Sequence, residues 1–254
     1  MSLVTRHFLI AVASAMLFLA ASSSTAFAWA EGSVITWGSP TNISGDTDVS
    51  TSGTLVAAFN MNGSAVTVNG VTFASFTFPF MAQTASNGAF TFTESPGHML
   101  AESGLGSANS PFSGLSANYQ SLLSTAVSTD DNNTLTLTMS GLTVGHQYVF
   151  EFWVNGSNSA GTDNFRTTAT APNSVSLDDN TTNAIGGTGQ FVIGTFTCGD
   201  PTEVISFTGT DTTQAPTVNA FQLRDITAVP EPSTMSILLV SGTLSGFRLL
   251  RRKK

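Results

Sequence analysis

Three short runs of acidic and amide side chains are the first candidates for a binding site, because each lies among turn-forming residues. The runs are Asp46 with Asp48, Asp130 with Asp131, and Asp178 with Asp179 and Asn180. Carboxylate and amide oxygens can assemble the six- to eight-coordinate site of a structural calcium ion. Asp and Asn side chains also stabilise turns by bonding to their own backbone. Both interpretations stay open from the sequence, and no other cofactor is predicted.

A second set of potential ligands is spaced four residues apart, at Glu94, His98 and Glu102. On a helix this spacing would align three groups on one face, as zinc sites can require. Pro96 and Gly97 lie between them and are incompatible with a helix interior. We therefore expect a polar loop here and predict no metal site.

Catalytic arrangements are hard to find in this chain. Acyl transfer needs a nucleophile, a base and an orienting acid, yet His98 and His146 are the only histidines after His7, and no Gly-x-Ser-x-Gly elbow is present. No pair of carboxylates stands out for glycoside hydrolysis. We expect that the protein is not an enzyme.

The charge distribution excludes one class of partner. Of 254 residues only 9% are charged, and between Trp29 and Val229 the only basic residues are Arg166 and Arg224. All but one of the sixteen acidic residues lie in that stretch. Such an anionic domain repels phosphate backbones, so nucleic-acid binding is not expected. Cys198 is the single cysteine, which rules out an intrachain disulfide and predicts a buried thiol.

The elements that must position these side chains are short strands. Residues 134–139 alternate Thr with apolar residues, and in residues 148–154 aromatic and apolar side chains occupy one face while Val149, Glu151 and Trp153 occupy the other. The turn at residues 140–145 between them predicts a β-hairpin. Further strands are predicted at residues 34–37, 54–60, 71–78, 89–93, 165–170, 189–197, 203–208 and 218–226, with one short helix in 115–127. The sequence predicts a single all-β sandwich over residues 31–227.

Trp153 and Glu151 are the candidate glycan contacts of this sandwich. If Phe150 and Phe152 face the core, Trp153 points away from it. An exposed indole can stack on a sugar ring while a neighbouring carboxylate bonds sugar hydroxyls. The alternative is that a loop covers the indole. Trp37 and Tyr119 are weaker candidates by the same argument.

Both ends of the chain carry apolar segments flanked by basic residues. Residues 1–28 have the order of a signal peptide, with Ala26 and Ala28 as the small residues of the cleavage site. At the other end, residues 235–250 form a predicted transmembrane helix, and Arg251, Arg252, Lys253 and Lys254 follow as a basic stop. The basic residues favour the cytoplasmic side, which places the preceding domain outside the cytoplasm.

The C-terminal segment begins with Val229, Pro230, Glu231 and Pro232, and continues into the apolar stretch and the basic tail. In this order, residues 229–254 resemble the PEP-CTERM sorting signal of Gram-negative bacteria. The resemblance implies processing by an exosortase, in bacteria that usually secrete exopolysaccharide. It also implies anchoring in the inner membrane, followed by release to the cell surface or the extracellular space.

The middle domain resembles galactose-binding-like and malectin-like jelly rolls in its pattern of a strand, a Gly-rich turn, an aromatic strand and a final strand at 219–225. That resemblance implies a jelly-roll-like sandwich and carbohydrate binding, with exopolysaccharide as the partner. We therefore expect an exported surface or matrix protein handled by signal peptidase and an exosortase. The alternative is a structural, self-assembling envelope or matrix protein without a specific small ligand.

Overall fold

The computed structural model describes residues 33–130, 133–160, 165–210 and 214–228. The predicted signal peptide with Ala26 and Ala28, the sorting motif at 229–232, the apolar segment 235–250 and the basic tail at 251–254 all lie outside these ranges. Among the described residues, no helix has the length and apolar character needed to cross a membrane.

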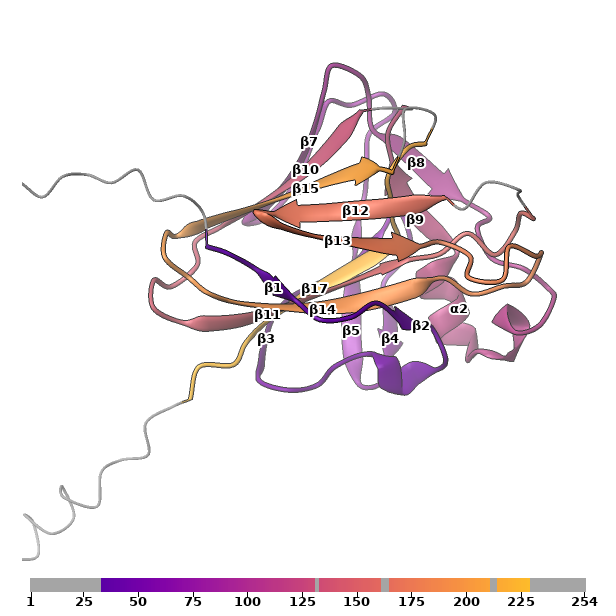
Figure 1. Ribbon diagram of the computed structural model, residues 1–254, viewed down its shortest axis with the longest axis horizontal. Coiled ribbons are helices and arrows are strands. Elements are labelled where there is room, and N and C mark those ends of the chain that lie inside the picture. Colours follow the sequence, from indigo (N-terminus) through magenta and orange to yellow (C-terminus); the bar gives the residue numbers. More distant parts are fainter. Residues whose placement is uncertain (1–32, 131–132, 161–164, 211–213, 229–254) are drawn as a thin grey trace, which may run out of the picture. The chain divides into compact units, whose positions relative to one another are not determined.

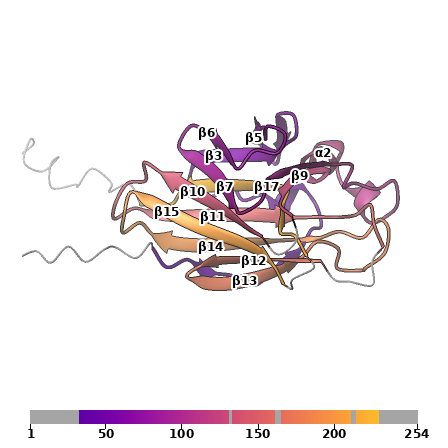
Figure 2. The same ribbon diagram turned by 90° about the horizontal axis from the view of Figure 1, so that it is seen from above.

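The described part is mostly β-structure arranged as a sandwich of two large sheets (Figures 1 and 2). The eight-stranded sheet has the order β1 (Thr36–Trp37), β14 (Gln190–Thr197), β11 (Gln147–Val154), β17 (Ala220–Asp225), β3 (Thr54–Met61), β5 (Val71–Phe76) and β4 (Val66–Val68), and β2 (Thr41–Asn42) also pairs with β14. The six-stranded sheet has the order β13 (Asn173–Asp178), β12 (Arg166–Ala171), β15 (Thr202–Gly209), β10 (Thr134–Ser140), β7 (Phe90–Ser95) and β6 (Thr84–Asn87).

Smaller elements complete the domain. A three-stranded sheet joins β16 (Thr217–Val218), β9 (Thr125–Ser128) and β8 (Leu100–Ser103). The helical elements are α2 (Ala117–Leu123) and two 3-10 turns, η1 (Asp46–Asp48) and η2 (Phe112–Gly114). Almost all strand pairs are antiparallel, and the exception is the parallel pair of β3 and β5. The predicted all-β class is confirmed.

The main core lies between the two large sheets and is rich in phenylalanine. Phe152 of one sheet meets Phe207 of the other edge-to-face, with ring centroids 5.3 Å apart, and Phe59 meets Phe90 at the same distance. Edge-to-face pairs of this kind add about 0.5–1.5 kcal/mol each beyond the area they bury. The alternation seen in the sequence explains the layer, because apolar residues point inward and Thr and Ser point outward.

A second core covers the opposite face of the eight-stranded sheet. Helix α2 packs there with the segment that contains η1 and with β4 and β5. The helix begins at Ser116, whose hydroxyl accepts a hydrogen bond from the backbone N–H of Tyr119, as is usual for an N-cap. Strands β11 and β17 are therefore buried on both faces, which is uncommon for strands of an antiparallel sheet.

The predicted strands are all present, and the short helix predicted within residues 115–127 is α2, after which residues 125–128 form β9. The predicted hairpin is wrong, since β10 pairs with β7 and β15 while β11 pairs with β14 and β17. The turn between β10 and β11 carries the chain from one sheet to the other, so their apolar faces meet across the core. The predicted burial of Cys198 is confirmed.

Candidate functional site

The predicted glycan contacts lie inside the protein. Phe150 and Phe152 face the main core as predicted, and Trp153 points away from it, but the second core encloses its indole completely. The indole N–H donates to the hydroxyl of Tyr119 at 2.9 Å, and the ring packs edge-to-face on Phe73. An enclosed indole cannot stack on a sugar, so the exposed-tryptophan hypothesis is wrong. The covered indole, which the sequence left open, is the arrangement found.

Glu151 is buried on the same face and fastens the segment that follows η1. One carboxylate oxygen accepts hydrogen bonds from the backbone N–H of Ser50 and from the amide of Gln222. The other oxygen has no hydrogen-bond partner in the part of the chain that the structure describes. Burial raises the pKa of Glu151 to about 7, although the bonds from Gln222 and Ser50 oppose this shift. Glu151 thus holds a loop in place and is not available to a glycan.

Arg224 completes this buried polar group from the neighbouring strand β17. Its guanidinium donates to the backbone carbonyls of Thr51, Ser52 and Gly53, at distances between 2.7 and 3.0 Å. It also donates to the side-chain oxygen of Gln222 at 3.2 Å. Residues 50–53 therefore cover the outer face of β11 and β17 around Glu151, Gln222 and Arg224.

The other weaker aromatic candidates are also engaged in the fold. Tyr119 is buried, and its hydroxyl donates to Asp48 while it accepts the bond from Trp153. Trp37 is half-buried against Phe150 and Phe152, and its N–H donates to the carbonyl of Asn173 at 2.9 Å. Both side chains join distant segments, which accounts for their presence without a ligand.

The first acidic turn, at Asp46 and Asp48, is used for local structure. Asp48 accepts hydrogen bonds from the backbone of Ser44 and Gly45, and Asp46 accepts one from the hydroxyl of Ser116. These are the turn and cap interactions expected of Asp. In the described part of the chain, no three His, Cys, Asp or Glu side chains come close enough together to hold a metal ion.

The acidic turn at residues 178–180 is likewise occupied by protein contacts. Asp178 forms an ion pair with Arg166, and the side-chain amide of Asn180 donates to three backbone carbonyls of the adjoining loops. Burial, together with the nearby charge of Asp178, raises the pKa of Asp179 to about 7. Asp131 lies outside the described residues.

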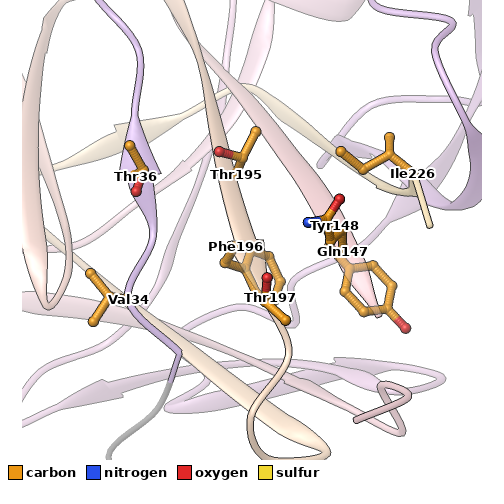
Figure 3. A pocket seen from close by; sticks show the side chains of 8 residues that line it. All are labelled: Val34, Thr36, Gln147, Tyr148, Thr195, Phe196, Thr197 and Ile226. Carbon is orange, nitrogen blue, oxygen red and sulfur yellow. The ribbon is translucent and has the colours of Figure 1, made fainter. Parts of the chain in front are cut away.

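The described surface is hollowed on the outer face of the eight-stranded sheet, where β1, β14 and β11 lie side by side. We call this hollow the threonine trough, and its volume is about 460 Å³. Its lining comprises Val34, Thr36, Gln147, Tyr148, Thr195, Phe196, Thr197 and Ile226. Figure 3 shows Val34 and Thr36 on one side of the trough and Ile226 on the other, with Thr195 between them.

Strand register explains why these side chains gather. Thr36 is paired with Thr195, and Thr197 is paired with Gln147, so hydroxyl and amide groups of three adjacent strands share one face. Tyr148 and Phe196 turn their rings to the core side, where they stack 5.5 Å apart. Two stacked aromatic rings thus lie beneath the strands of the trough, and no lining residue is charged.

Two glycines allow close packing next to residues of the trough. At Gly53, φ is +78° and an added Cβ would lie 2.5 Å from the carbonyl oxygen of Asp225 and 2.7 Å from Ile226, so the loop comes this close only with glycine. At Gly194, an added Cβ would lie 2.5 Å from Ile35 and 2.6 Å from the indole of Trp37. Gly194 therefore lets β1 lie close to β14.

A histidine and an aspartate form an ion pair at the same end of the sandwich. Nδ1 of His146 lies 2.7 Å from the carboxylate of Asp225. Burial opposes the charge of Asp225, but hydrogen bonds from His146 and Thr227 outweigh it and lower its pKa. These contacts tie the start of β11 to the end of β17, next to Gln147 and Ile226 of the trough.

Sequence analysis did not single out any residue of the trough. The alternation in β14 places Thr195 and Thr197 on one outward face, which is a usable signal. What the pattern does not give is the neighbour of each strand. Thr36 and Gln147 reach Thr195 and Thr197 only through pairings between segments more than forty residues apart in the chain.

Comparisons with known proteins give weak similarities. No family model matches the sequence, and the search of curated proteins found no match. Among solved structures, the chain is similar to the plant receptor-like kinase FER, with 15% identity and a TM-score of 0.39 over 70% of this chain and 43% of that one. It therefore spans less than half of that structure. A second similarity is to carbohydrate-binding modules of the β-sandwich superfamily, with 12% identity and a TM-score of 0.16 over 59% of this chain and 71% of that one.

Proposed function

We propose that this chain is an exported surface or extracellular-matrix protein whose β-sandwich binds a neutral glycan in the threonine trough without cleaving it. The observation that carries the proposal is the uncharged lining of the trough. Thr36, Thr195 and Thr197 offer hydroxyls and Gln147 offers an amide, which are suited to the hydroxyls of a sugar. Val34 and Ile226 offer apolar surface for its C–H groups.

The charge of the domain supports a neutral ligand over an acidic one. The whole chain has a net charge of −8 at pH 7. A polyuronate or sulfated glycan would be repelled by this field, whereas a neutral polymer would not. The volume of the trough, about 460 Å³, is also enough for one or two sugar rings, since small-ligand sites begin at about 300 Å³.

Export and sorting are supported by the sequence of the chain ends. The apolar segment before Ala28 and the Pro230-Glu231-Pro232 tail with its basic stop indicate delivery across the inner membrane, processing by an exosortase and residence near secreted polysaccharide. The same proposal includes a jelly-roll-like topology, anchoring of the chain in the membrane through residues 235–250, and the absence of catalysis.

Glycan binding is tested by calorimetry of the purified full-length protein with a panel of neutral oligosaccharides. The double variant T195V/T197V keeps the shape of the trough and removes two hydroxyls. At about 0.5–1.5 kcal/mol for each hydrogen bond, its affinity should fall about tenfold. The matched control is Thr136→Val on the outer face of the six-stranded sheet, which should leave the affinity unchanged. Equal affinities of the double variant and the control would refute the proposal.

Export and tail processing are tested separately. Mass spectrometry of the native protein should show a new N-terminus near residue 29 and loss of the segment after the Pro230-Glu231-Pro232 motif. A periplasmic reporter enzyme fused after Thr227 should be active outside the cytoplasm. An unprocessed tail that reaches Lys254 would contradict exosortase processing, and reporter activity confined to the cytoplasm would contradict export.

A second candidate function is self-assembly within the matrix, favoured by the outer face of the six-stranded sheet. One row of directly paired residues crosses all six strands and consists only of Ser and Thr: Ser174, Thr170, Ser206, Thr136, Thr93 and Thr84. Such a face carries no charge along this row to keep copies apart. Sedimentation at increasing protein concentration should then show association that Thr136→Arg abolishes and Thr195→Arg does not, and a monomer at every concentration would exclude this function.

A further inference from the structure

Glu94 presents an unusual carboxylate at the end of β7. Its side chain is buried, with 3% of the residue exposed. Oε1 accepts a hydrogen bond from the side-chain amide of Asn133 at 2.9 Å, while Oε2 has no partner among the described residues. A buried carboxylate oxygen without a partner is energetically costly, because it has lost its hydration without gaining a hydrogen bond.

Two further polar side chains converge with Glu94 on one point beside Gly97. A Cβ added to Gly97 would lie 2.5 Å from Oε1 of Glu94, 2.9 Å from Oδ2 of Asp130 and 2.4 Å from Nδ2 of Asn133. Because glycine has no Cβ, all three groups approach the backbone of Gly97 closely and lie next to one another. Glu94 and Asp130 come from separate sets in the sequence, and the fold brings them together.

The electrostatics at this point favour a positive charge. Burial raises the pKa of Glu94, the hydrogen bond from Asn133 lowers it, and the carboxylate of Asp130 raises it again. His98 favours the ionised carboxylate of Glu94, both electrostatically and through its backbone N–H. A cation between Glu94 and Asp130 would remove their mutual repulsion and give Oε2 its missing partner.

We propose that Glu94, Asp130 and Asn133 bind a calcium ion beside Gly97. The ligands would be the carboxylate oxygens of Glu94 and Asp130 and the side-chain oxygen of Asn133. For this, the side-chain amide of Asn133 rotates by half a turn, which exchanges the positions of its O and N atoms. Water completes the six to eight oxygen ligands, which calcium accepts in flexible geometry and magnesium does not. With two carboxylates, the site belongs with extracellular modules that bind calcium at about 10⁻⁴–10⁻³ M.

The location gives the ion a structural role that is independent of the trough. Glu94 is the second-last residue of β7, Gly97 lies in the loop before β8, and Asp130 and Asn133 form the turn that leads into β10. A calcium ion would join these three segments at one end of the six-stranded sheet. The site is formed by the six-stranded sheet and its loops, so its test is separate from the test of glycan binding.

Calorimetry of the calcium-free full-length protein with CaCl2 tests the site, together with the melting temperature in 10 mM CaCl2 and in 10 mM MgCl2. The wild-type protein should bind one calcium ion and melt higher in calcium than in magnesium. Asp130→Asn, an exposed position where folding is not at risk, should weaken calcium binding at least tenfold, and Glu94→Gln should abolish it. The matched control is Glu102→Gln, whose carboxylate bonds to Ser128 on the neighbouring strand.

Three results would overturn the proposal. The first is a wild-type protein that shows no heat of binding and no rise in melting temperature in 10 mM CaCl2. The second is an equal rise in melting temperature for Asp130→Asn and Glu102→Gln. The third is an equal response to calcium and magnesium, because that would indicate general screening of an acidic surface and not a site.

Discussion

Glu151 makes the stability of the domain fall as the pH rises, a direction opposite to that of most paired carboxylates. Its pKa rises from an ordinary value of 4.5 to about 7 in the folded protein, because burial disfavours the charged form. The folded state therefore holds its proton more tightly than the unfolded state between these two values. Stability from this group is full below pH 4.5, declines up to about pH 7 and is constant above it.

The size of the effect follows from the two pKa values. At about 1.4 kcal/mol for each pH unit, a rise from 4.5 to about 7 corresponds to at most about 3 kcal/mol. Most of this is lost between pH 5 and pH 8, where about 2 to 3 kcal/mol should disappear from the free energy of unfolding. Urea unfolding followed by tryptophan fluorescence at several pH values measures it.

Glu151→Gln isolates the contribution of this residue, because Gln keeps an oxygen for Ser50 and Gln222 but has no proton to titrate. The variant should lose less stability than the wild-type protein between pH 5 and pH 8, by about 2 to 3 kcal/mol. The remaining slope includes Asp179, whose pKa is also raised to about 7. Thr136→Val, which removes no titratable group, serves as the control and should keep the full wild-type slope. Parallel curves for Glu151→Gln and the wild-type protein would refute the reasoning.

Three further predictions concern packing and an ion pair. Trp153→Phe removes the hydrogen bond to Tyr119 and should lower the free energy of unfolding by about 1–3 kcal/mol with unchanged glycan affinity; reduced affinity alone would mean that the indole reaches the ligand. Gly194→Ala should displace Trp37 and β1, which should lower the free energy of unfolding in urea by about 1–3 kcal/mol and weaken glycan binding. Unaltered stability would show that β1 has room to move. Asp225→Asn should lower the melting temperature at neutral pH, where the ionised Asp225 stabilises the wild-type protein. The wild-type protein loses this stability as the pH falls through the lowered pKa of Asp225, so the two melting temperatures should converge in acid. A constant difference between them would contradict this prediction.

The strands could be predicted because each has a clear period. Thr and apolar residues alternate through β10, and the faces of β11 were assigned correctly from the positions of Phe150 and Phe152. Strand partners could not be predicted, because period 2 describes the faces of a strand and not its neighbours. The short Gly-rich turn before β11 looks the same whether it closes a hairpin or crosses between two sheets.

The environment of Trp153 shows the same limit at the level of one side chain. Its direction away from the main core was correct, but its exposure depends on α2 and on Phe73, which come from distant parts of the chain. Tyr119, the polar partner of the indole, lies in the predicted helix, but the sequence indicated it only as a weaker glycan contact. The sequence also could not predict that Glu94 and Asp130 both lie beside Gly97, because this depends on the register between β7 and β10.

The most direct test of glycan binding in the threonine trough is hydrogen exchange of the full-length protein with and without a saturating neutral oligosaccharide. Protection should increase at residues 34–37, 147–149, 195–197 and 226, and the six-stranded sheet and α2 should exchange as before. Protection confined to the Ser/Thr face of the six-stranded sheet, or to the loops around Trp153, would contradict the account.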